Sequence, residues 1–205
     1  MKYPVLKNRM DAIRPLIQEK SVLDLGCVDH DLKQLKGTWL HRELIQSARK
    51  VLGVDSLPEA VQKLKEMGFN TVCQNVEELD LHEKFDVAIA GEIIEHLNNP
   101  GRFLSAIHRH LQDQGQLILT TPNPFSIAQF FKIIKHHQIK VNTEHTTWFD
   151  PQTLQVLLKN HHFKVQKIYW LHDFKRFYWR SLFARLRPYF HDGFLIIAEK
   201  GIISS

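Results

Sequence analysis

The stretch "LDLGCVDH", residues 23–30, marks the point where a buried segment becomes a turn. The apolar run "SVLDLG", residues 21–26, has the length and aliphatic content of a strand, and it ends in Gly26, which can adopt backbone angles closed to other residues. A Gly-x-Gly-x-Gly loop would have its second and third glycines where this chain has Val28 and His30. The sequence therefore predicts a strand that ends in a tight turn, followed by a loop with a path of its own.

Beyond this strand, short apolar runs alternate with longer segments of helical period. The runs that predict strands are residues 21–26, 50–55, 70–74, 85–91, 115–121, 163–171 and 193–201, and the segments that predict helices are 40–48, 57–67, 101–112 and 150–161. This alternation is typical of an α/β fold with a mostly parallel sheet and helices on both faces. Because no crossover helix separates the last two runs, we expect a seven-stranded sheet with an antiparallel edge strand.

Composition indicates a single globular domain over residues 1–205. Of the 205 residues, 43% are hydrophobic and 24% are charged, which is sufficient for one sizeable core, and the formal net charge of +5 permits anionic partners. Cys27 and Cys73 form neither a disulfide framework nor a zinc ribbon pattern, which favours a reducing compartment. The N-terminal segment has no apolar secretion core, and no run is long enough to span a bilayer, so we expect a cytoplasmic protein.

The ends of the first two predicted strands indicate a nucleoside site. The first closes with Asp24 and Gly26, and the second ends in Asp55. A carboxylate in this position can accept hydrogen bonds from two ribose hydroxyls, and a glycine turn allows close approach of the backbone. A dinucleotide has a pyrophosphate that needs close approach of the backbone, so the missing glycines argue against a dinucleotide. They argue less strongly against a cofactor that has no phosphate. The alternative interpretation is a glycine-ended strand beside a solvated Asp55.

From about residue 20 to residue 171, the chain resembles the class I S-adenosylmethionine (SAM)-dependent methyltransferases. The motifs that carry this resemblance are "VLDLGC" (22–27), "VLGVDSLPEAV" (51–61), "QNVEELDL" (74–81), "KFDVAIAGEIIEHLNNPGRFL" (84–104), "HLQDQGQLILTTPNP" (110–124) and "WFDPQTLQVLLKNHHFKV" (148–165). The last three are similar to ubiquinone-biosynthesis O-methyltransferases and to the methyltransferases of polysaccharide gene clusters. The resemblance implies the Rossmann-like fold of class I methyltransferases and SAM as the cofactor.

The resemblance also implies which residues contact SAM. Asp24, Gly26 and Cys27 would line the methionine end, Asp55 the ribose, Ser56 and Leu57 the edge of the adenosine, Asn75, Val76 and Glu77 the adenine, and Ala90 and Gly91 the methionyl portion. Two features depart from the family pattern. Asn75 stands where the family usually has Asp, and Asp55 comes later in the chain than usual because of extra residues around "KQLKGTWLHREL" (33–44).

A second cluster, "GEIIEHL" (91–97), follows the fourth predicted strand. If a helix starts directly after that strand, Glu92, Glu95 and His96 share one face of a single turn at the carboxyl edge of the sheet, where open α/β sheets bind ligands. Two neighbouring carboxylates repel each other unless a cation or a hydrogen-bond donor lies between them. We therefore interpret Glu92, Glu95 and His96 as candidate catalytic residues.

A later histidine extends this cluster. The Glu-x-x-Glu-His turn followed by His145 is similar to the metal site of small-RNA 2'-O-methyltransferases and to a related site in the ubiquinone enzymes. This resemblance implies that Glu92, Glu95, His96 and His145 bind a divalent metal such as Mg, Mn or Zn, which would lower the pKa of an acceptor hydroxyl. The alternative is that the two glutamates cap or pair structurally while His96 acts alone as a general base.

Two further segments leave alternatives open. Residues 171–192, between the last two strands, interleave aromatic and basic residues, and we consider a peripheral membrane contact beside a lipid-linked acceptor, a grip on single-stranded RNA, or an insertion that packs over the active site or a second subunit. Residues 120–138 begin with turn residues and continue as an amphipathic segment, which predicts a lid or a core helix.

The function that these features favour is O-methylation of a hydroxyl on a small molecule, a sugar or lipid-linked glycan, or a quinone precursor. The alternatives are an RNA 2'-O-methyltransferase and a non-catalytic SAM-binding module, for which the substituted glycine loop is the main argument. Nucleic acid is the less favoured partner, because the basic residues gather in one segment. The presence of both Asp55 and the acidic turn favours an enzyme over a binding module.

Overall fold

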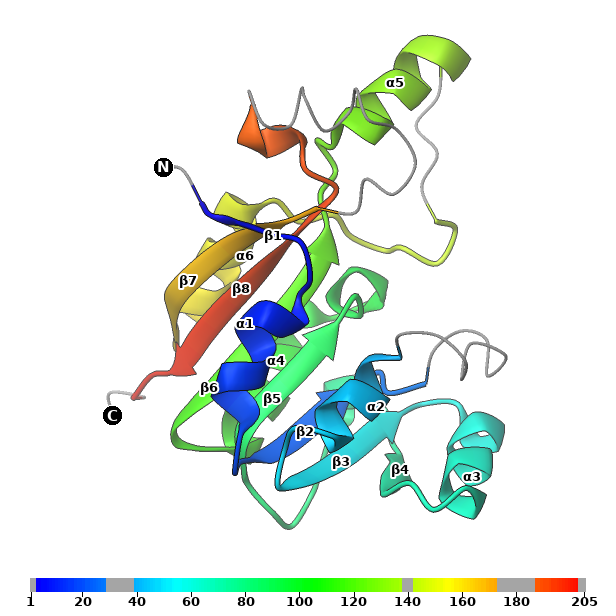
Figure 1. Ribbon diagram of the computed structural model, residues 1–205, viewed down its shortest axis with the longest axis vertical. Coiled ribbons are helices and arrows are strands. Elements are labelled where there is room, and N and C mark those ends of the chain that lie inside the picture. The colour runs from blue at the N-terminus through cyan, green and yellow to red at the C-terminus, as the bar shows by residue number, and fades with distance from the viewer. Residues whose placement is uncertain (1–2, 29–38, 138–141, 173–186, 203–205) are drawn as a thin grey trace.

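A computed structural model describes residues 3–28, 39–137, 142–172 and 187–202 (Figure 1). Its strands are β1 (Val5–Leu6), β2 (Ser21–Leu25), β3 (Lys50–Asp55), β4 (Thr71–Cys73), β5 (Phe85–Gly91), β6 (Leu111–Pro122), β7 (Phe163–Leu171) and β8 (Gly193–Lys200). Its α-helices are α1 (Met10–Ile17), α2 (Leu40–Ile45), α3 (Pro58–Glu66), α4 (Pro100–His110), α5 (Ile127–His136) and α6 (Pro151–Asn160). The described ranges also contain the short 3₁₀ helices η2 (Val76–Glu78), η3 (Ile94–His96) and η4 (Pro188–Phe190).

The strands form one sheet in the order β1-β7-β8-β6-β5-β2-β3-β4. All seven predicted strands are present in it, and the mostly parallel α/β architecture is confirmed. The strand count differs from the prediction, because β1 adds a short parallel pair with β7, Val5 opposite Trp170. Two residues are too few to show the period of a strand, so the sequence did not indicate β1.

The position of the antiparallel strand also differs from the prediction. β8 runs antiparallel to both β6 and β7 and lies between them, not at the edge of the sheet. The burial of the two strands explains this order. The first six residues of β8 are all buried, whereas exposed and buried residues mix along β7. A strand that is apolar on both faces is best placed inside the sheet, where helices cover both faces.

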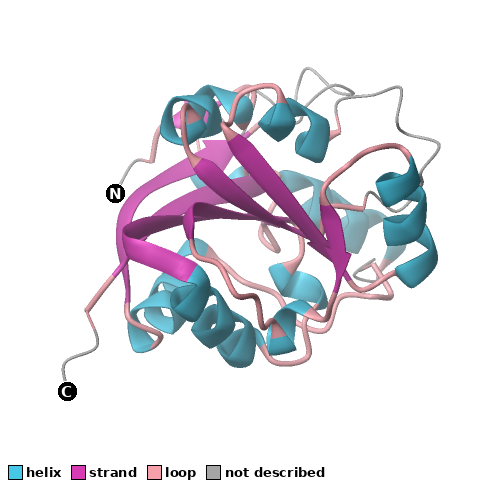
Figure 2. Ribbon diagram, turned by 90° about the horizontal axis from the view of Figure 1, so that it is seen from below, coloured by secondary structure: helices cyan, strands magenta, loops and turns pink. Residues whose placement is uncertain are grey.

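Helices cover both faces of the sheet, as Figure 2 shows. Neighbouring residues of β2 point to opposite faces, since Leu23 packs in the larger core cluster and Val22 in the smaller one. The larger cluster contains buried side chains from α4 and α6, and the smaller one contains side chains from α1 and α2. Within the described ranges, no helix has both the length and the apolar content needed to cross a membrane.

Helix starts follow the local sequence. Asp150 accepts hydrogen bonds from the backbone N–H groups of Gln152 and Thr153, and Pro151 occupies the first position of α6. Asn99 caps α4 in the same way, through Arg102 N–H. Because α4 and α6 are fixed at their first residues, the segments that lead into these two helices have defined end points.

The amphipathic segment 120–138 contains α5, which stands out from the end of β6 in Figure 1. Phe130, Ile133 and Ile134 on this helix are exposed, as is Phe125 before it, so these side chains do not form a core helix. The central part of the aromatic and basic segment 171–192 lies outside the described residues. At the end of that segment, Tyr189 and His191 pack against Trp170, with ring centroids 5.1 and 6.2 Å away.

Candidate functional site

The carboxyl ends of β2, β3 and β5 surround a pocket of about 520 Å³. The residues that line it are Arg9, Asp24, Gly26, Cys27, Val28, Trp39, Leu40, His41, Asp55, Ser56, Leu57, Gly91, Glu92, Ile93, Glu95, His96, Pro122, Asn142, Glu144 and His145. In open α/β sheets, ligands bind in the crevice outside these strand ends. Most of the predicted cofactor residues and all four predicted metal ligands therefore line one pocket.

The turn after β2 depends on Gly26. Its φ is +75°, and its N–H and that of Cys27 both donate to the Val54 carbonyl, at 2.8 and 3.2 Å. A Cβ on Gly26 would lie 2.9 Å from Cδ1 of Ile93, so both the backbone angle and the space favour glycine. The chain then crosses the end of β3, where Val28 N–H donates to Asp55 Oδ2 at 3.0 Å. This hydrogen bond holds the backbone at Val28, the place of the missing second glycine, while His30 lies outside the described residues.

Asp55 is buried at the end of β3, 8% exposed. Its two carboxylate oxygens accept hydrogen bonds from Val28 N–H and from Leu57 N–H, the latter at 3.2 Å. Burial raises the pKa of Asp55 above its ordinary value, and the backbone donors oppose that shift. Each oxygen has a second lone pair, so the carboxylate can still accept hydrogen bonds from a pair of vicinal hydroxyls.

Four predicted cofactor residues do not line the pocket. Asn75 caps η2 by accepting from Glu77 N–H at 3.0 Å, and Glu77 accepts from Asn98 N–H at 2.9 Å. Val76 and Ala90 belong to the main core cluster. These residues thus have structural contacts that account for them, and their predicted role toward an adenine or a methionyl group stays a prediction.

The acidic turn after β5 does not form the single helical turn that the spacing predicted. Glu92 has a φ of +54°, and its N–H donates to the Thr120 carbonyl at 2.9 Å, which extends the pairing with β6 by one residue. The helix starts later, as η3, and is a 3₁₀ turn. Glu92 is consequently exposed while Glu95 is buried, so the two carboxylates occupy different environments.

Glu95 is the buried acid of the site, 1% exposed. Its Oε2 accepts a hydrogen bond from Thr121 Oγ1 at 2.9 Å, and Oε1 has no hydrogen-bond partner among the residues that the structure describes. Burial raises the pKa of Glu95 to about 7, and the nearby Glu92 charge contributes in the same direction. A carboxyl group in this state can hold or release a proton near neutral pH.

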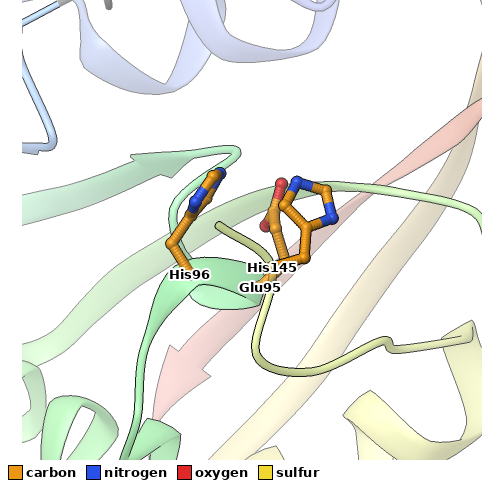
Figure 3. A group of neighbouring side chains, drawn as sticks. All are labelled: Glu95, His96 and His145. Atoms are coloured by element: carbon orange, nitrogen blue, oxygen red, sulfur yellow. The ribbon is translucent and has the colours of Figure 1, made fainter. Parts of the chain in front are cut away.

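Backbone hydrogen bonds bring His145 to Glu95. The Glu95 carbonyl accepts from Thr146 N–H at 2.9 Å and from Thr147 N–H at 3.2 Å. The rings of His96 and His145 then lie 4.6 Å apart, centroid to centroid, and burial lowers the pKa of His145. Figure 3 shows Glu95 and His96, from the segment after β5, and His145, from the loop before α6, close together.

These three side chains match most of the predicted metal site. Glu95, His96 and His145 each offer one ligand atom, and these atoms all lie within 4.8 Å of one another. Glu92 lines the same pocket but is not a member of this group, so the predicted set of four is reduced to three among the described residues. The acid and the two imidazoles form a donor set suited to a first-row transition metal.

Sequence reasoning did not identify several residues of the pocket. Arg9 lies in the turn before α1, far from the recognised motifs, with Nη1 3.6 Å from where a Cβ on Gly91 would be. His41 is buried and bonded to Asp24, and its only sequence signal is its place in the extra residues after the first turn. Glu144 was noted in the sequence beside His145 but was given no role, and its Oε2 lies 4.0 Å from His96 Nδ1.

Comparison with known proteins relates this arrangement to one family. A family model described as "Methyltransferase domain" matches residues 1–168. A ubiquinone biosynthesis O-methyltransferase of Rickettsia conorii is 28% identical over 124 residues, which are 58% of this chain and 40% of that protein. The human mitochondrial ubiquinone biosynthesis O-methyltransferase is 26% identical over 171 residues, 76% of this chain and 44% of that protein. The chain thus spans less than half of the length of these two relatives.

The fold is also that of solved methyltransferase structures. A SAM-dependent methyltransferase from Archaeoglobus fulgidus superposes with a TM-score of 0.67 and 19% sequence identity, covering 95% of this chain and 92% of that one. These findings agree with the resemblance that the sequence motifs carry.

Proposed function

The chain belongs to the methyltransferase domain family, and from this premise we propose that it transfers the methyl group of SAM to a hydroxyl oxygen of a small molecule. The observation that carries the proposal is that Asp55 and the Glu95, His96 and His145 cluster line one pocket. One end of that pocket suits a ribose, and the other holds groups that can accept a proton.

The carboxylates of the pocket suit the charge of SAM. Its sulfonium and its α-ammonium are both cationic, and the lining includes Asp24, Asp55 and Glu92. Asp55 would accept hydrogen bonds from the ribose hydroxyls, and the turn at Gly26 allows close approach of the ligand. Arg9 is a cation in the same lining, which suits the carboxylate of the methionyl group.

The cluster at the other end suits the acceptor. In the reaction, an acceptor oxygen attacks the methyl carbon, the bond between that carbon and the sulfur breaks, and the hydroxyl proton must leave the oxygen. Oε1 of Glu95 has no hydrogen-bond partner in the described part of the chain, so it can accept this proton, directly or through His96. Thr121 holds the other oxygen of Glu95 and fixes its direction.

As the alternative to proton transfer to Glu95, we propose that Glu95, His96 and His145 bind a divalent metal. Their ligand atoms are close enough for one ion, and two imidazoles with one carboxylate leave coordination positions for an acceptor. Such an ion, when bound, would lower the pKa of a hydroxyl that it contacts. The geometry favours an acceptor with two neighbouring hydroxyls, such as a catechol, because these can occupy adjacent positions of one ion.

The relatives favour a quinone precursor as the acceptor. Both are named for ubiquinone biosynthesis, whereas the chain matches less than half of their length. A screen of catechols, sugar diols and short RNA with a labelled methyl donor tests this assignment. We expect methylated catechol product; methylation of RNA alone would favour the RNA 2'-O-methyltransferase, and no product with any acceptor would favour the binding module.

The catalytic role of the cluster is tested with Glu95→Gln, which keeps the size of the side chain and removes the base. We expect turnover to fall by about 100-fold or more, with unchanged SAM affinity in calorimetry. Glu66→Gln, on the exposed face of α3 outside the pocket lining, is the matched control. Metal content per chain and activity, each measured before and after chelation, distinguish a metal-assisted reaction from general-base catalysis. Full activity of the metal-free protein contradicts the metal site. Full activity of Glu95→Gln contradicts the catalytic role of the cluster.

A further inference from the structure

A buried pair of side chains forms part of the pocket wall between its two ends. Asp24 lies on β2 and His41 on α2, and Nδ1 of His41 is 2.8 Å from Oδ2 of Asp24. Asp24 is 2% exposed and His41 is 1% exposed. Because a carboxylate only accepts hydrogen bonds, the hydrogen of this bond lies on Nδ1 of the imidazole. In the neutral ring, Nε2 then carries a lone pair.

The position of the His41 ring is fixed from several sides. Trp39 and Phe69 pack against it with ring centroids 5.1 and 5.8 Å away, and Trp39 Nε1–H donates to the Cys27 carbonyl at 2.9 Å. A Cβ on Gly53 would lie 2.8 Å from Cε1 of His41, so the backbone of β3 closes another edge of the ring. The ring is therefore held with little freedom to turn.

One polar atom of the pair remains without a partner. Nε2 of His41 is buried and has no hydrogen bond to any residue that the structure describes, although His41 lines the pocket. A buried acceptor without a donor is unfavourable, and a ligand that supplies an N–H or O–H group relieves that cost. The lining of the pocket therefore includes a buried, fixed acceptor that no described residue uses.

The order of the strands indicates which donor of SAM meets it. β2 lies between β3, which carries Asp55, and β5, which leads to Glu95. With the ribose at Asp55 and the methyl group directed toward Glu95, the sulfur lies between them, and the amino-acid part that branches from the sulfur lies beside β2. The donor group on that part is the α-ammonium, and the carboxylate of Asp24 behind the ring favours a cation there.

We propose that His41, held by Asp24, accepts a hydrogen bond from the α-ammonium group of SAM. This inference rests on the proposed function, since it requires SAM in the pocket. His41 is then a positioning residue for the cofactor, and Asp24 acts through it. Trp39 and His41 both belong to the extra residues, 33–44, that precede Asp55 in the sequence.

The test compares two ligands by calorimetry: S-adenosylhomocysteine, and its deaminated analogue that keeps the carboxylate. The wild type should bind the first ligand more tightly. His41→Asn places an amide donor near Nδ1, which keeps the bond to Asp24, but has no acceptor near Nε2. We expect this variant to lose about tenfold in affinity for S-adenosylhomocysteine, about 1.4 kcal/mol, with a change of less than about twofold for the analogue.

Two further variants distinguish the loss of the contact between His41 and the ligand from a loss of folding. His41→Gln carries its amide near the Nε2 position and should recover part of the preference for S-adenosylhomocysteine. His108→Asn is the matched control, because His108 is also buried but lies outside the pocket and bonds to the Gly201 carbonyl at 3.0 Å. It should keep the full preference. Melting temperatures of all variants establish that they are folded.

The outcomes distinguish this inference from the proposed function. If the wild type binds neither ligand, the proposed function itself is wrong. If the wild type binds S-adenosylhomocysteine and His41→Asn weakens both ligands equally, His41 is only structural or contacts the carboxylate, and the inference is overturned. Unchanged affinities in His41→Asn overturn it as well.

Discussion

Single residues shape the proposed cofactor end of the pocket where the backbone leaves no room for a side chain. A glycine is required at position 26 because φ is positive there and because Ile93 leaves no room for a Cβ. The sequence indicated this glycine through the turn that it predicts after the first strand. Gly53 lies inside β3, where its missing side chain leaves the space that Cys27 and His41 occupy. No rule of turns predicts that position, because the reason is a contact with residues far away in the sequence.

Gly53 and Gly68 give a paired prediction, because a Cβ would meet neighbouring atoms at Gly53 and none at Gly68. Gly53→Ala pushes on the Cys27 sulfur and the His41 ring, each 2.8 Å from the new Cβ, so we expect weaker binding of S-adenosylhomocysteine. Gly68→Ala meets no atom within 4 Å but must adopt a φ of +86°, so we expect a loss of about 1 kcal/mol in the free energy of unfolding with unchanged binding. Calorimetry and urea unfolding measure the two effects. Equal binding by both variants would show that the packing around His41 is unimportant.

Among the elements, the apolar runs predicted the parallel strands of the sheet. The segments that connect these strands determine which side chains meet in the pocket. The predicted helical turn at Glu92, Glu95 and His96 was wrong, because pairing with β6 continues through Glu92 and delays the helix. His145 could be connected to that turn only by resemblance. In the structure, the Thr146 and Thr147 N–H groups bind the Glu95 carbonyl, and such long-range backbone contacts leave no periodic signal in the sequence.

The amino ends of β2 and β5 give a prediction about pH. Ser21 donates to Asp86 Oδ2 through its N–H and its hydroxyl, both at 2.8 Å, and these bonds, the N–H foremost, hold the pKa of Asp86 below its ordinary value. A lowered folded-state pKa means that the stabilisation is present above the unfolded pKa, near 4, and is lost as the pH falls through the folded pKa. Asp86→Asn should therefore cost about 1–2 kcal/mol at pH 7 and progressively less below about pH 4.

Urea unfolding at a series of pH values measures this difference. Asp113→Asn, at a carboxylate that is 98% exposed, is the control and should follow the wild type at each pH. A stability difference for Asp86→Asn that stays constant down to pH 3 would mean that the charge of Asp86 does not contribute.

In the whole molecule, the sheet brings the proposed cofactor end and the proposed acceptor end into one pocket. The ends of β2 and β3 supply Gly26 and Asp55, and the segments after β5 and before α6 supply Glu95 and His145. The first pair follows from a local pattern, a glycine turn and an acidic strand end. The second pair depends on segments that meet only in the folded chain, which is why the sequence predicted the cofactor more fully than the acceptor.

Binding of SAM in this pocket through Asp55 is measured by calorimetric titration of S-adenosylhomocysteine into the wild type, Asp55→Asn and Asp113→Asn. We predict one site per chain in the wild type and in Asp113→Asn, and affinity reduced by at least about tenfold in Asp55→Asn, which has one carboxylate oxygen fewer for the ribose. No binding by the wild type would mean that the pocket does not take SAM, and equal binding by all three proteins would mean that Asp55 does not hold the ribose.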